Sequence, residues 1–145
     1  MTGVDLRKRR TPWLPAWVPK TGIELREAGM DFDAVRMPDR AGEDAMNILR
    51  RLTAYVPGPV LSEYGGRWFY FLVPPRTARN LTWPKWVTLC APGEGETTYV
   101  GVPGLSGATG SLQWLTLPTA ERPYVCAYLL ERVVKEIKRE AADLP

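Results

Sequence analysis

Two stretches of the chain carry apolar residues at helical spacing. The first, Asp39 to Val56 ("DRAGEDAMNILRRLTAYV"), begins with acidic residues and ends with basic ones, which suits the dipole of a helix, and Asp39 is its predicted N-cap. The second runs from about Glu121 to Ala142. The predicted buried faces are Ala41, Ala45, Ile48, Leu49 and Leu52 in the first, and Val125, Leu129, Leu130, Val133, Val134 and Ile137 in the second. The pattern predicts two amphipathic helices.

The other apolar runs are short and predict β-strands. "RWFYFLV" (Arg67 to Val73) is aromatic and almost wholly apolar, which is typical of a central strand buried on both faces. "DFDAVRM" alternates up to Pro38 and predicts the opening strand. "VLSEY", "KWVTLC", "TYVGVP" and "LQWLTLP" predict further strands, and Gly65-Gly66 supplies the positive φ of a tight hairpin. "GIELREAGM" is ambiguous; it fits a short helix ending at Gly29.

This order of elements predicts an α+β fold. We expect a single two-layer domain over residues 21–145, with a mainly antiparallel sheet, a long helix after the first strand and a C-terminal helix. A chain of 145 residues is long enough for one core. Residues 1–20 form a basic arm rich in Pro and Trp ("TPWLPAWVPK"), whose prolines exclude a regular helix. Trp13 and Trp17 are expected to pack across the domain or against a partner.

The amino-acid composition limits the catalytic groups and metal ligands that this chain can supply. The chain has no histidine, so it lacks the commonest general base and the commonest zinc ligand. Cys90 and Cys126 fit no metal motif and are expected to be reduced, buried thiols. The Gly-rich "GEGETTYVG" and "GLSGATG" lack the Walker Lys-Ser/Thr ending and are expected to be hairpin loops. No cofactor is expected. No apolar run reaches membrane-spanning length and no signal peptide is visible, which favours a cytoplasmic location without membrane contact.

Basic residues supply candidate contacts to nucleic acid. The net charge is only +3, but four cations cluster at the start of the chain as a candidate phosphate-binding arm: Arg7, Lys8, Arg9 and Arg10. The aromatic side chains of residues 68–71 alternate across the sheet. If one face lacks helices, they form a base-stacking platform beside Arg67, Arg76 and Arg79; if both faces are covered, they belong to the core.

Two aspartates form a candidate metal pair. Asp31 and Asp33 stand one residue apart in the predicted first strand, so both side chains would lie on one face and could bind a divalent ion. Glu63 is the candidate third carboxylate. In the alternative interpretation Asp31 is a polar residue at the start of the strand, and Asp33 pairs with Arg36 or with a backbone amide.

Several blocks also resemble a known family. "FDAVRMP", "GPVL", "WFYFLVPPRTA", "TYVGVPG" and "QWLTLP" resemble small actinobacterial proteins similar to the C-terminal part of the bifunctional primase/polymerase (Prim-Pol) N-terminal domain. The resemblance implies an α+β fold related to archaeo-eukaryotic primases, which use an acidic pair, a further Asp and a histidine-bearing motif. Asp31 and Asp33 match the acidic pair by residue type, and no histidine is present. The implied protein is a reduced, non-catalytic relative.

The sequence is therefore consistent with three functions. The leading expectation is a non-catalytic binding or regulatory protein whose partner is DNA or RNA. One alternative is a metal-dependent nucleotidyl-transfer enzyme that uses Asp31 and Asp33. The other is a protein–protein interaction module that binds its partner through the N-terminal arm and the aromatic residues of the sheet.

Overall fold

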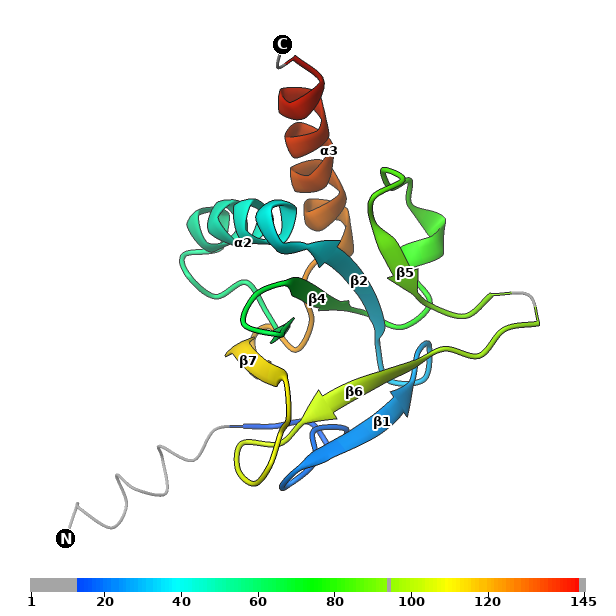
Figure 1. The fold of residues 1–145 in the computed structure, drawn as a ribbon, viewed down its shortest axis with the longest axis vertical. Helices are drawn as coiled ribbons and strands as arrows, with labels where there is room; N and C mark the ends of the chain where they lie inside the picture. Colours follow the sequence, from blue (N-terminus) through cyan, green and yellow to red (C-terminus); the bar gives the residue numbers. More distant parts are fainter. Residues whose placement is uncertain (1–12, 94, 144–145) are drawn as a thin grey trace, which may run out of the picture.

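The computed structural model describes residues 13–93 and 95–143, with side chains through Ile137. It confirms the α+β class, with one long helix after the opening strands and one at the C-terminal end (Figure 1). In chain order the elements are β1 (Ile23–Glu27), β2 (Asp33–Pro38), α2 (Asp39–Leu52), β3 (Val60–Glu63), β4 (Trp68–Val73), the 3-10 turn η1 (Ala78–Asn80), β5 (Thr88–Cys90), β6 (Tyr99–Pro103), β7 (Leu112–Thr116) and α3 (Ala127–Asp143).

A five-stranded antiparallel sheet forms the middle of the molecule. Its strand order is β5-β2-β4-β3-β7, so β4 is central, as its apolar sequence predicts. Helices α2 and α3 pack against each other on one face of this sheet (Figure 1). Alternate residues of β2 and β4, among them Val35, Met37, Phe69 and Phe71, point into the core beneath the helices.

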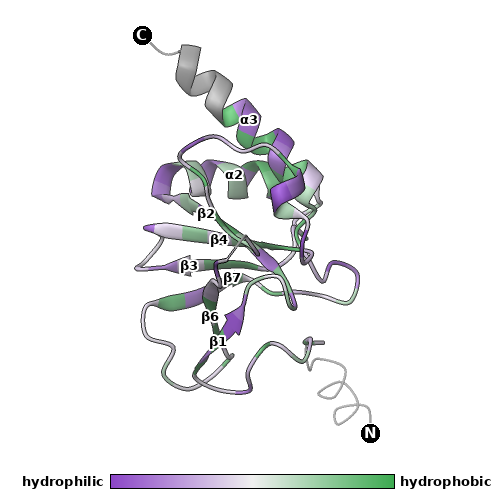
Figure 2. Cartoon of the chain, turned by 90° about the vertical axis from the view of Figure 1, so that its right-hand side faces the viewer, coloured by the Kyte–Doolittle hydropathy of each residue, from purple (hydrophilic) through white to green (hydrophobic). Residues whose placement is uncertain are grey.

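A second, two-stranded antiparallel sheet, β1-β6, covers part of the opposite face (Figure 2). Between the two sheets lies a second apolar cluster that includes Phe32, Leu61, Leu72 and Val102. Trp17 belongs to this cluster, and its ring centroid lies 5.0 Å from that of Phe32. The described end of the Pro- and Trp-rich segment therefore packs on the domain.

Local pattern mispredicts β1 and the ends of the helices. Residues Ile23–Glu27 form a strand rather than a helix, because they pair with β6, far away in the sequence. Pro38, not Asp39, is the N-cap of α2, and the Asp39 carboxylate instead accepts a hydrogen bond from the Arg40 amide. Helix α3 begins at Ala127, later than its periodicity predicts. Of the two cysteines, Cys90 is buried as expected, whereas Cys126 is exposed.

The buried face of α2 is rotated from the predicted one. Leu52 is 60% exposed. The buried residues are Gly42, Ala45, Met46 and Leu49. Gly42 explains the rotation, because a Cβ atom there would lie only 2.4 Å from the Phe69 ring. The helix therefore approaches the sheet at a position that lacks a side chain.

Within the described part of the chain, no helix is long and apolar enough to cross a membrane.

Candidate functional site

Arg36 is stacked on an aromatic ring on the face of the five-stranded sheet that points away from α2 and α3. Its neighbours Val35 and Met37 point toward the helices, so alternation directs Arg36 to the opposite face. Trp68 and Tyr70 reach the same face from β4, where Arg36 is paired with Tyr70. The Arg36 guanidinium carbon lies 3.6 Å from the centroid of the Trp68 ring and 6.0 Å from that of Tyr70. This geometry is a cation–π contact.

Glu63 in β3 completes this cluster through a hydrogen bond. The Tyr70 hydroxyl donates to Glu63 Oε1 at a distance of 2.8 Å. Burial, followed by this hydrogen bond and the charge of Glu63, raises the pKa of the Tyr70 phenol far above its ordinary value. Tyr70 is therefore a neutral donor at physiological pH, and the Glu63 carboxylate is held on β3 beside the aromatic pair.

The terminal nitrogens of the Arg36 guanidinium are its candidate contacts to a ligand. Among the described residues it makes no hydrogen bond or ion pair, and its Nε is buried without a partner. Stacking thus fixes the plane of the group, and its terminal Nη1 and Nη2 donors, rather than the buried Nε, are the ones that a ligand would contact. Such a group can pair with an anionic oxygen or with the edge of a nucleobase. We call Arg36, Glu63, Trp68 and Tyr70 the Arg-aromatic cluster.

The three arginines predicted from the sequence do not come together. Arg67 is exposed in the turn before β4, next to the Arg-aromatic cluster. Arg76 and Arg79 follow the other end of β4, a six-residue strand about 17 Å long. Arg79 donates to the carbonyl oxygens of Pro92 and Ala91, and Arg76 donates to the Gly29 carbonyl at 3.4 Å. Arg76 and Arg79 therefore stabilise the loops that contain these carbonyl groups.

The predicted basic arm, Arg7 to Arg10, lies outside the described residues.

Asp31 and Asp33 do not share a strand face. Asp31 lies in the turn before β2, where its carbonyl accepts a hydrogen bond from the Tyr124 hydroxyl at 2.7 Å. Asp33 is the first residue of β2 and is fully buried. Its Oδ2 accepts the backbone N–H groups of Thr77 and Ala78 at 3.1 and 3.0 Å. The backbone-amide interpretation of Asp33 is therefore confirmed.

Glu63 does not join Asp33 in a metal site. In the antiparallel register Asp33 lies opposite Val73, whereas Glu63 lies opposite Trp68 at the other end of β4. Within residues 13–93 and 95–143 no group of three or more His, Cys, Asp or Glu side chains is arranged to hold a metal ion. Glu63 is therefore separated from Asp33 by the length of β4.

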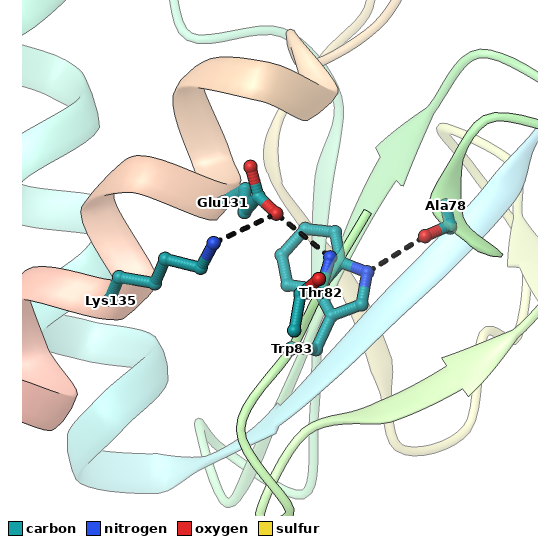
Figure 3. A network of polar contacts seen from close by, with 5 residues as sticks. All are labelled: Ala78, Thr82, Trp83, Glu131 and Lys135. Atoms are coloured by element: carbon teal, nitrogen blue, oxygen red, sulfur yellow. Dashed lines mark hydrogen bonds and ion pairs between the residues drawn. The ribbon is translucent and has the colours of Figure 1, made fainter. Parts of the chain in front are cut away.

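A polar network on the helix side has a structural role (Figure 3). The Glu131 carboxylate on α3 accepts the backbone N–H of Thr82 at 2.8 Å and pairs with Lys135 at 3.1 Å. The Thr82 hydrogen bond, and to a lesser degree Lys135, lowers the pKa of Glu131. Nearby, the Trp83 indole donates to the Ala78 carbonyl at 2.8 Å. The Thr82 bond holds the loop between η1 and β5 against α3, and the Trp83 bond holds the same loop against η1.

No family model, curated protein or solved structure matches this chain.

Proposed function

We propose that this protein is a non-catalytic nucleic-acid-binding protein that holds a single strand on the face of its five-stranded sheet that points away from α2 and α3. The observation that supports the proposal is the Arg36 guanidinium, which is stacked 3.6 Å from the Trp68 ring and whose terminal N–H groups make no hydrogen bond or ion pair with the described residues. An arginine held flat in this way is suited to nucleobases and phosphates, which offer planar surfaces and paired oxygens.

The surroundings of Arg36 fit a nucleic-acid strand. Trp68 and Tyr70 are half-buried, so each retains some accessible surface on this face. Base–aromatic stacking tolerates any sequence, because every base has a π-face. Exposed Arg67, directly before Trp68 in the chain, adds a candidate phosphate contact. The basic run Arg7 to Arg10 adds salt-dependent attraction.

Two considerations favour binding over nucleotidyl transfer. Oδ2 of Asp33 accepts hydrogen bonds from two backbone amides, and its other oxygen, Oδ1, is buried and belongs to no group of three or more side chains arranged to hold a metal among the described residues. The raised pKa of Tyr70 keeps its phenol protonated, which is a poor state for a general base. The resemblance to Prim-Pol-like proteins supports the same class of partner, and its blocks include parts of β2, β3 and β4, the strands that carry the Arg-aromatic cluster.

Fluorescence anisotropy with a labelled oligothymidylate at low salt tests the proposal. Arg36→Ala and Trp68→Ala are each expected to raise the dissociation constant by about 10-fold, which corresponds to the loss of one stacking or cationic contact. Arg36→Lys should be intermediate, because it retains the charge and loses the planar group. Each variant should first show a cooperative thermal transition like that of the original chain.

Arg51→Ala is the matched control for charge. Arg51 is an exposed arginine on α2, on the helix-covered side of the sheet, so its removal should change affinity less than twofold. Absence of binding at tens of micromolar protein would refute the proposal. A loss in Arg51→Ala equal to that in Arg36→Ala would show that net charge, not the Arg-aromatic cluster, binds the strand.

A further inference from the structure

The outer edge of β1 presents unpaired backbone groups. Gly22 and Ala28, which flank β1, are hydrogen-bonded to Gly104 and Thr98 on the β6 side. Pairing alternates along an antiparallel strand, so Glu24 and Arg26 also face β6, and the intervening residues face outward. The outward N–H and C=O groups of Ile23 and Leu25, together with the N–H of Glu27, have no partner among the described residues.

The side chains of this edge are accessible. In Figure 1, β1 lies at the lower outer margin of the molecule, and among the described strands it pairs with β6 alone. Leu25, at the centre of the strand, is 67% exposed, and Ile23 is 40% exposed. The strand contains no proline and pairs with β6 in regular register. An accessible, apolar and regular edge of this kind is a template for another strand.

The charged residues of β1, Glu24 and Arg26, favour pairing with a second β1 strand. We propose that a second copy of this chain pairs with β1 in antiparallel orientation, about a twofold axis through Leu25. Leu25 then lies opposite Leu25 of the second copy. Glu24 of each copy lies opposite Arg26 of the other, and opposite charges at facing positions stabilise a strand pair. The interface is isologous and extends the small sheet to four strands, β6-β1-β1-β6.

The neighbouring registers are disfavoured by the same charges. Only shifts by two residues keep the outward backbone groups of both strands facing each other. One such shift places Glu24 opposite Glu24 of the second copy, and the other places Arg26 opposite Arg26. Like charges at facing positions are destabilising. The sequence "IELRE" therefore specifies one symmetric pairing and opposes the adjacent ones.

Arg26 is already oriented for this role. Its Nε donates to the Trp17 carbonyl at 3.0 Å, and its Nη2 lies 2.7 Å from Glu24 Oε2 in the same chain. Because one bond to the backbone fixes the guanidinium, less side-chain freedom is lost when a second carboxylate approaches. In the dimer the four charged side chains alternate in sign along one face of the joined strands.

Sedimentation-velocity ultracentrifugation of the full chain tests this inference. At about 100 µM the original chain should contain dimers, because a single strand pair is a small interface. Glu24→Arg and Arg26→Glu each create like-charge pairs at both positions, and each should raise the dimer dissociation constant about 10-fold. An equimolar mixture of the two variants should form heterodimers as readily as the original chain, since both facing pairs become opposite in sign again.

The mixture separates this pairing from other forms of self-association. A monomeric original chain at that concentration would overturn the inference. So would a dimer that Glu24→Arg does not weaken, or a mixture that associates no better than its two components. Glu24→Arg is not expected to disturb the fold. The Glu24 side chain is exposed, and its only described polar contact is the ion pair with Arg26. Its thermal transition should match that of the original chain.

Discussion

Asp33→Ala is expected to lower the free energy of unfolding by about 3 kcal/mol. The substitution removes the oxygen that accepts the backbone N–H groups of Thr77 and Ala78, and the Ala78 bond is buried. Both donors would lose their partner, and an unsatisfied buried donor costs its full desolvation penalty. These residues begin the loop that carries η1 over the core, so the loss should appear in the global transition. Urea unfolding at neutral pH measures it.

Asp31→Ala is the matched control for Asp33→Ala. Only the backbone carbonyl of Asp31 accepts a described hydrogen bond, from Tyr124, and the substitution leaves that carbonyl in place. Its cost should stay within about 0.5 kcal/mol. Equal losses in the two variants would contradict the structural role of Asp33. A rise in melting temperature on addition of Mg²⁺ or Mn²⁺ that disappears in Asp33→Ala would restore the metal interpretation.

Local pattern predicts an element well when its own residues carry the signal. The all-apolar run of β4 and the amphipathic periodicity of α3 are of this kind, and both elements form. β1 carries alternating charge and apolar residues, and its state depends on β6, whose residues lie more than 70 positions later. Likewise, the face that α2 buries is set by the approach of Gly42 to Phe69 on β4, which helical periodicity alone cannot predict.

The candidate site depends even more on register. Whatever the register, alternation along β2 directs the side chain of Arg36 to one face of the sheet and those of Val35 and Met37 to the other face. Its stack on Trp68, however, requires the pairing that places Pro38 opposite Trp68 and Arg36 opposite Tyr70. The sequence contains no signal for that register. The sequence predicts that three arginines near the aromatic run contact nucleic acid. In the structure two of them, Arg76 and Arg79, donate to loop carbonyls instead.

Gly58→Ala is expected to lower the free energy of unfolding by about 3 kcal/mol, from two separate causes. Gly58 has φ +105°, which costs a residue with a side chain about 1–2 kcal/mol. A Cβ atom there would also lie 2.7 Å from the backbone carbonyl atoms of Tyr124 and 2.8 Å from the Val125 nitrogen. Relieving that overlap requires a backbone shift that costs about 1–3 kcal/mol.

Gly65→Ala separates these two causes. Gly65 also has positive φ, +66°, but a Cβ atom there would have no neighbour within 4 Å, so only the backbone cost of about 1 kcal/mol should remain. Near Gly58, the Val125 N–H donates to the Leu72 carbonyl of β4, so displacing residues 124–125 would strain the central strand as well. Urea unfolding of both variants gives the difference. Losses that differ by no more than about 1 kcal/mol would mean that φ alone requires glycine at position 58. A loss in Gly58→Ala that is larger by more than this would mean that this glycine lets the segment before α3 lie directly against the segment before β3.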